Sequence, residues 1–152
     1  MKDGATKEFV QAYNAQAVVD SQAQVIVAAA VTQEANDKQQ LVPMLEQVKI
    51  VTGSKPQQAT ADAGYFSEAQ VTDPKLEGID LLVAPDRQKH GQQAPVTTGP
   101  PAPESSGVAE QMRHQMRTAE GRAVYKCARP LWNRSLARSK SSVVFGDFCC
   151  ED

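Results

Sequence analysis

The stretch YNAQAVVDSQAQVIVAAAVT, residues 13–32, decides how the rest of the chain is interpreted. Its first part, residues 13–20, alternates towards an apolar end, and residues 24–32 are rich in valine, isoleucine and alanine. Such alternation and β-branched residues are typical of strands, and the short polar segment SQAQ between them is typical of a hairpin loop. The pattern therefore predicts two antiparallel strands.

A helix is predicted next, over residues 36–53. Its leucine and valine side chains recur on one face, and Asn36 or Asp37 is the predicted N-cap. Gly53 is the predicted stop signal. Pro43 leaves two alternatives open, because it either kinks this helix or lies in its true first turn.

Three shorter elements follow this helix. A short strand is predicted to end near Asp62, residues 67–74 suit a capped helical turn that Pro74 breaks, and residues 78–85 form a compact apolar strand pattern. The order of strands and helices predicts an α/β domain over residues 1–85, built on a mixed sheet with flanking helices.

The composition is that of one globular domain. The chain has 152 residues, of which 41% are hydrophobic and 22% are charged. No run approaches the roughly 20 apolar residues that a membrane span requires. The first residues, MKDGATKEF, lack the apolar core of a signal peptide, so the sequence predicts a cytoplasmic protein.

The second half of the chain differs in composition from the first. Residues 86–107 are dominated by proline, glycine, glutamine and serine, which predicts an exposed, mobile linker. Residues 108–126 return to a helical pattern that is interrupted at Gly121. The net charge of -2 provides no strong basic field over the whole chain. Basic residues nevertheless gather in the helix and beyond it, and both a solvated polar face and a phosphate-contacting face fit that pattern.

Asp62 is the candidate functional residue, within TADAGYFS at residues 60–67. A carboxylate just past a strand end in an open α/β sheet faces the crevice where ligands bind, and it can hold Mg²⁺ through oxygen. Gly64 permits a close backbone approach. The alternative is a turn aspartate that accepts hydrogen bonds from local backbone amides.

The chain resembles bacterial insertion-sequence transposases of the DDE type. The resemblance is carried in order by YNAQAVVDSQAQVIVAAAVTQEANDKQQLVPMLEQVK, ADAGYFSE and GIDLLVAPDRQ, and it runs from about residue 1 to residue 126. It implies a partial RNase H-like fold. It also implies an activity that cleaves and joins transposon DNA ends, with two Mg²⁺ ions held by three acidic residues. Asp62 matches the second of these residues, the aspartate of the D-A-G-Y block.

The first and third acidic partners are less direct. The resemblance places the first aspartate before the strand that matches YNAQ, upstream of Met1. Within the chain, Asp20 is the other candidate for this metal-binding aspartate. Asp20 also fits a purely structural role as a residue of the hairpin turn. The third should be a glutamate in a block similar to V-E-P-V-F-G-Q-I-K after residue 126, and this chain lacks that block in its own frame.

Residues 127–152 are predicted to be an out-of-frame tail without stable structure. Read from the third base of Lys126, the codons can spell MRKAIVEPVFGQIKEQRGFRRFLLRG, which contains the family block. The expected glutamate then straddles Trp132 and Asn133. A frameshift at or near Lys126 follows, and the three cysteines of the tail are by-products of that frame.

The predicted function is that of a DDE transposase fragment that cannot cleave DNA by itself. Its partners by resemblance are transposon DNA ends and either a second copy of the chain or a full-length transposase. The alternative is a non-catalytic DNA-binding or regulatory module that associates with a full-length transposase, with the basic helix at 108–126 contacting phosphates.

Overall fold

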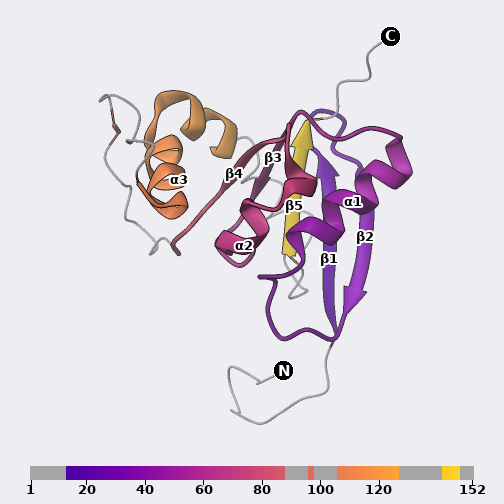
Figure 1. Cartoon of the computed structure of the whole chain (residues 1–152). Coiled ribbons are helices and arrows are strands. Elements are labelled where there is room, and N and C mark those ends of the chain that lie inside the picture. The colour runs from indigo at the N-terminus through magenta and orange to yellow at the C-terminus, as the bar shows by residue number, and fades with distance from the viewer. Residues whose placement is uncertain (1–12, 88–95, 98–105, 127–141, 148–152) are drawn as a thin grey trace, which may run out of the picture.

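The computed structural model describes residues 13–87, 96–97, 106–126 and 142–147, and everything below concerns these residues. They form a five-stranded mixed sheet in the order β2-β1-β5-β3-β4, with helices beside it (Figure 1). The elements are β1 (Asn14–Asp20), β2 (Ile26–Thr32), α1 (Leu41–Thr52), β3 (Gln58–Ala61), α2 (Glu68–Val71), a 3₁₀ turn (Pro74–Leu76), β4 (Asp80–Val83), α3 (Val108–Arg117) and β5 (Ser142–Asp147). The predicted α/β class, a mixed sheet with flanking helices, is confirmed.

The predicted hairpin is also confirmed. β1 and β2 pair antiparallel, from Asn14 opposite Thr32 to Val19 opposite Ile26. The register shifts between Val18 and Val19, so the ladder carries one irregularity near the turn.

Helix α1 begins later than the sequence pattern predicted. Its first residue is Leu41, so Pro43 lies in the first turn, where the N–H that proline lacks needs no partner within the helix. The predicted N-cap at Asn36 or Asp37 is wrong, since the N-cap residue is Gln40. The side chain of Asp37 instead reaches β1. Gly53 ends the helix as predicted, with φ at 81° in the left-handed region.

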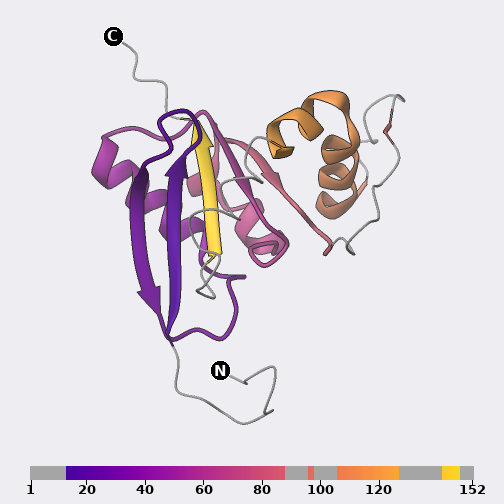
Figure 2. The ribbon, with the colours of Figure 1, turned by 180° about the vertical axis from the view of Figure 1, so that it is seen from behind.

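Helices α1 and α2 lie on one side of the sheet, where α1 packs against β1 and β2 and α2 packs against α1 (Figure 1). The core between these layers is formed by apolar side chains from α1 and from the strands: Val18, Leu41, Met44, Leu45, Val48, Ala59, Ala61 and Val83. Burying each large aliphatic side chain of this kind contributes about 1.5–3 kcal/mol. Figure 2 shows the opposite face, over which no described helix lies.

Strand β5 corrects the prediction that residues 127–152 lack structure. Residues 142–147 form the middle strand of the sheet, parallel to β1 and antiparallel to β3. Without it, β1 and β3 would present facing edges of unpaired N–H and C=O groups, and the segment SVVFGD, with two valines and one phenylalanine, is suited to pair with both. Residues 127–141 and 148–152 lie outside the described part of the chain.

The helical region after the linker is interrupted at a different residue from the one predicted. The break is at Thr118, and a second helical segment spans residues 119–126. Gly121 lies inside that segment, where a Cβ atom would collide with the carbonyl oxygen of Gln115. The glycine therefore serves close packing of the second segment on the end of α3. Most of the predicted linker lies outside the described residues.

Candidate metal and active site around Asp62

Asp62 lies directly after β3, at the C-terminal end of the strand. Its Oδ1 accepts a hydrogen bond from the backbone N–H of Gly64 at 2.7 Å, and its carbonyl accepts one from the N–H of Tyr65 at 3.2 Å. These bonds are those of a turn aspartate. The local contacts alone therefore do not distinguish a metal ligand from a turn residue.

A second carboxylate faces the same turn. The point where a Cβ atom on Gly64 would sit lies 2.9 Å from Oδ1 of Asp62 and 3.0 Å from Oδ2 of Asp37. Because both oxygens are within 3.0 Å of one point, they are no more than about 6 Å apart, twice that distance. The loop before α1 and the turn after β3 thus bring two carboxylates together over a glycine.

Asp37 is held by polar side chains of β1 that are themselves buried. Its Oδ1 accepts hydrogen bonds from Nδ2 of Asn14 at 2.5 Å and from Nε2 of Gln16 at 2.7 Å. The Oε1 of Gln16 accepts a hydrogen bond from the Tyr65 hydroxyl. Asn14, Gln16 and Tyr65 are 4%, 2% and 0% exposed, so this network links both sides of the site below the surface.

The electrostatics of the site act on Asp62. Burial raises the pKa of its carboxyl above the usual 3.8, and the hydrogen bond from Gly64 opposes that shift. The charge of Asp37 raises the pKa further, whereas the charge of Arg87 lowers it. A carboxyl with a raised pKa beside a like charge is typical of functional sites.

Asp20, the other predicted site residue, lies at the far end of β1. Its carboxylate accepts hydrogen bonds from the backbone N–H of Ala23 at 2.8 Å and of Gln22 at 3.5 Å, within the hairpin turn. The structure therefore gives it the local contacts of a turn aspartate.

The strand register measures how far apart the two predicted residues are. Through β5, Ala61 lies level with Val18 and Ala59 lies level with Asp20. Asp62, one residue further along β3, is therefore displaced from Asp20 by about three residues along the strand direction, which is about 10 Å. The structure does not bring Asp20 and Asp62 together.

Three residues of the site were missed or misjudged from the sequence. Asp37 was predicted only as a helix cap, and Asn14 and Gln16 were given no role. A signal was present, because these two amides occupy alternate positions of β1 that face the helix layer, where apolar residues are expected.

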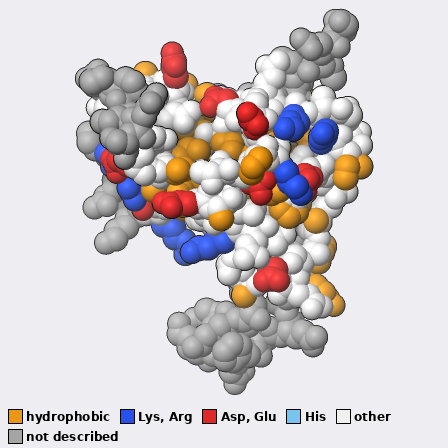
Figure 3. Space-filling model, in the orientation of Figure 1, with side chains coloured by type: hydrophobic (Ala, Val, Ile, Leu, Met, Phe, Trp, Pro, Cys, Tyr) orange, Lys and Arg blue, Asp and Glu red, His pale blue; other side chains and the backbone are white. Residues whose placement is uncertain are grey.

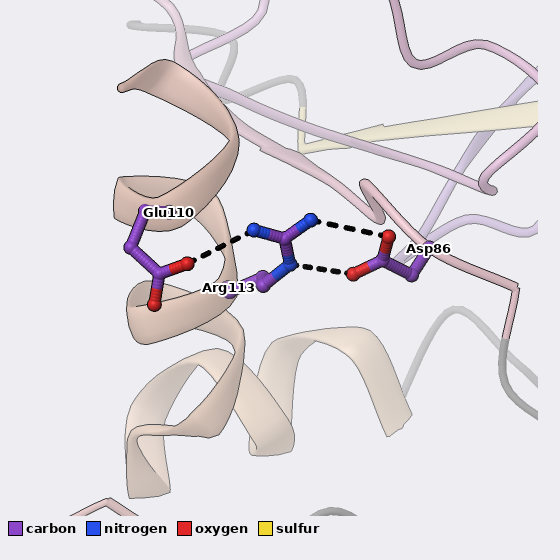
Figure 4. Close-up of polar contacts among 3 residues, drawn as sticks. All are labelled: Asp86, Glu110 and Arg113. Carbon is purple, nitrogen blue, oxygen red and sulfur yellow. Dashed lines mark hydrogen bonds and ion pairs between the residues drawn. The ribbon is translucent and has the colours of Figure 1, made fainter. Parts of the chain in front are cut away.

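The basic helix is partly engaged within the protein. The guanidinium of Arg113 on α3 bonds both oxygens of Asp86, at 2.6 and 3.2 Å, and Glu110 at 2.9 Å (Figure 4). The hydrogen bond from Arg113 lowers the pKa of the exposed Asp86 carboxyl. Acidic and basic side chains also lie intermixed over the face that carries α1 and α2 (Figure 3). That face offers no uniform basic patch among the described residues.

Comparison with known protein families adds an independent line of support. The family model described as the transposase DDE domain matches residues 2–141. The chain belongs to the transposase DDE domain family. The match extends past Lys126 into the tail. Neither the curated proteins nor the solved structures yield a match. The family gives the chain a transposase-type function and an RNase H-like fold, to which the partial mixed sheet corresponds.

Members of this DDE domain family generally use a divalent metal, typically Mg²⁺. Asp37 and Asp62 fit one such ion, since Mg²⁺ takes oxygen ligands and is commonly held by one or two carboxylates with water completing its shell. In the described part of the chain, no group of three or more histidine, cysteine, aspartate or glutamate side chains could hold a metal.

No helix within the described ranges is long and apolar enough to cross a membrane.

Proposed function

We propose that this DDE domain contributes Asp62 as a metal-binding aspartate of a transposase site that acts on transposon DNA ends, and that the 152-residue chain does not cut DNA by itself. The observation that carries the proposal is the position and environment of Asp62. This residue follows β3 in a glycine turn, its pKa is raised, and it lies within the matched span of the family.

The roles of the residues follow from the chemistry of phosphoryl transfer. When bound, two divalent ions activate a water or 3′-hydroxyl and stabilise the leaving oxygen of an in-line displacement. Asp62 would offer Oδ1 to such an ion while the N–H of Gly64 keeps the carboxylate oriented. Tyr65, which is fully buried, anchors the turn to Gln16 of β1.

The expected lack of cleavage rests on the missing third carboxylate. Two carboxylates can hold one hard cation, but two-metal geometry needs further oxygen ligands. In the shifted frame that we infer, the glutamate that the resemblance requires would fall across the codons of Trp132 and Asn133, so this chain would lack it. We infer a frameshift near Lys126 as the cause.

The alternative function is a non-catalytic DNA-binding or regulatory module that joins a full-length transposase. It would rely on Arg117, Arg122 and Lys126, because Arg113 is already bound to Asp86 and Glu110. Such a module would bind duplex DNA with an affinity that falls as salt rises, and it would do so without metal.

A strand-cleavage assay separates these proposals. The substrate is supercoiled plasmid DNA with Mg²⁺ or Mn²⁺, and nicking is measured on gels. Three proteins are compared: this chain, a chain that follows the other reading frame after Lys126, and that chain with an added family-type strand that carries the first aspartate and takes the place of β5, which the other frame replaces. Each is prepared with and without Asp62→Ala.

Metal-dependent nicking is expected only in the protein with both changes, and Asp62→Ala should abolish it. Asp20→Ala in the same protein is the matched control and should leave nicking unchanged. If the unaltered chain nicks DNA in a metal-dependent and Asp62-dependent way, the proposal of an inactive chain is wrong. If Asp62→Ala leaves the doubly altered protein fully active, the role of Asp62 is wrong.

A further inference from the structure

We propose that Asp37 is a second metal-binding carboxylate of the Asp62 site, and that one divalent cation binds between Oδ2 of Asp37 and Oδ1 of Asp62. The inference rests on the proposed function, because the family's use of a divalent metal is what makes a cation the expected ligand. It adds Asp37 to the site, a residue of the loop before α1 that lies outside the D-A-G-Y block.

The distance between the two oxygens suits a shared cation. They are separated by no more than about 6 Å, twice the 3.0 Å that bounds their distances to the Gly64 position. Two oxygens on one Mg²⁺ are at most about 4 Å apart, since each lies 2.0–2.1 Å from the ion. Where the two oxygens lie farther apart than this, a side-chain rotation at Asp62 or one bridging water would bring both within reach of one ion.

Asp37 is oriented for this role by its hydrogen bonds. Asn14 and Gln16 both donate to Oδ1, so Oδ2 is the oxygen that faces Asp62. Gln16 is fixed in turn by the hydroxyl of Tyr65, three residues after Asp62. Supporting bonds of this kind hold a metal-binding carboxylate in place before the ion arrives.

Gly64 keeps the space between the carboxylates free of a side chain. A Cβ atom there would lie 2.9 Å from Oδ1 of Asp62, closer than real Cβ atoms come to another atom, and a tight 3.0 Å from Oδ2 of Asp37. The position therefore separates the two carboxylates only by backbone. It also supplies the N–H that holds Oδ1 of Asp62, so one residue both opens the site and orients it.

The charges favour the same ligand. Two carboxylates this close repel each other when both are ionised, and partial burial of Asp62 strengthens that repulsion. A divalent cation between them turns the repulsion into attraction on both sides. An anion or a neutral ligand would leave the repulsion in place.

Paramagnetic broadening by Mn²⁺ tests the inference without any enzymatic activity. The whole chain, labelled with ¹⁵N, is titrated with MnCl₂ at low molar ratio, and the loss of each amide signal is measured. We expect the strongest broadening at two separate segments, the amides of Asp37 and Lys38 and the amides of Gly64 and Tyr65. This pattern is obtained from the natural sequence, so it does not depend on whether a variant folds.

Three variants sharpen the test. Asp37→Asn and Asp62→Asn should each weaken Mn²⁺ binding at the site at least tenfold, judged from the concentration that gives half-maximal broadening. Asp20→Asn, a charge-matched control on the hairpin, should leave it unchanged. Gly64→Ala should also weaken binding, because its Cβ crowds both oxygens.

The possible outcomes separate the inference from the proposed function. If Asp62→Asn weakens binding but Asp37→Asn does not, or if only the Gly64 segment is broadened, Asp37 is not a ligand and the role of Asp62 stands. If neither segment is broadened in the natural chain, both the inference and the metal-binding role of Asp62 are wrong.

Discussion

Asp62 and Asp20 both lie at the end of a strand, and their local contacts are nearly the same. Asp62 follows β3 and accepts the N–H of Gly64 at 2.7 Å, while Asp20 ends β1 and accepts the N–H of Ala23 at 2.8 Å. Only Asp62 meets a carboxylate from a distant segment, across the glycine of its turn. Among the described residues, the hydrogen bonds to the carboxylate of Asp20 come from backbone N–H groups of its own hairpin turn.

The comparison shows that a strand-end position is not sufficient for a site. What distinguishes the Asp62 end of the sheet is a buried network that joins β1 to the turn after β3, through Gln16 and Tyr65. Because β1 and β3 are not neighbours, this network depends on β5 to hold the two halves of the sheet in register.

The largest expected effect comes from breaking β5. Val144 pairs with both Val18 and Ala61, the residue before Asp62. Val144→Pro removes a ladder hydrogen bond in a central strand and should lower the free energy of unfolding by about 3 kcal/mol. Urea unfolding followed by circular dichroism measures this. The β1–β2 hairpin around Asp20 should keep its native amide shifts better than the turn at Gly64.

The control for this substitution is Ser142→Pro. Residue 142 begins β5, where proline is tolerated. Its effect on unfolding should be clearly smaller. If both substitutions have equally small effects, β5 does not hold the sheet together. The difference between the Asp62 end and the Asp20 end of the sheet would then not depend on β5.

Strand β5 also marks the limit of prediction from the sequence. The hairpin, the strand before Asp62 and the strand at 80–83 were predicted because each carries its own periodicity. Residues 142–147 were dismissed because their reading frame made them seem unselected. A strand in the middle of a sheet is decided by the edges it joins, and a local pattern does not reveal those edges.

The next effect concerns the buried network. Tyr65→Phe removes the hydroxyl that bonds Gln16 and leaves a buried carbonyl oxygen without that donor, which should cost about 1–3 kcal/mol. Tyr13→Phe is the matched control, because Tyr13 is 66% exposed and its change should stay within about 0.5 kcal/mol. Thermal unfolding of both variants compares them directly, and similar losses of stability would argue against a network that is specific to the Asp62 end.

The site itself was only half predictable for the same physical reason. Asp62 was found because its turn motif is contiguous in the sequence. Asp37 was assigned to capping because a polar residue before a helix usually caps it. Its real partners, Asn14 and Gln16, lie more than twenty positions earlier, and only the folded sheet brings them together.

A smaller effect is expected from removing the charge of Asp62. Its pKa is raised in the folded state, so the folded protein binds the proton more tightly than the unfolded chain, and ionisation destabilises the fold. In metal-free buffer at pH 7, Asp62→Asn should therefore unfold at a higher temperature than the natural chain. The difference should vanish at about pH 3, below the unfolded pKa of 3.8.

Asp20→Asn provides the opposite case. It loses one acceptor in the hairpin turn and gains nothing from lost repulsion, so it should not stabilise the protein at pH 7. If Asp20→Asn raises the unfolding temperature as much as Asp62→Asn does, the stabilisation comes from the change in net charge and not from the surroundings of Asp62.

The central claim is that Asp37 and Asp62 face each other, and the titration of Asp62 tests it most directly. The ¹³C shift of the Asp62 carboxyl is followed against pH in metal-free buffer, in the natural chain and in Asp37→Asn. We expect a pKa above 3.8 in the natural chain and a lower pKa once the charge of Asp37 is removed. A pKa at or below 3.8 in the natural chain, or one that Asp37→Asn leaves unchanged, would contradict the account.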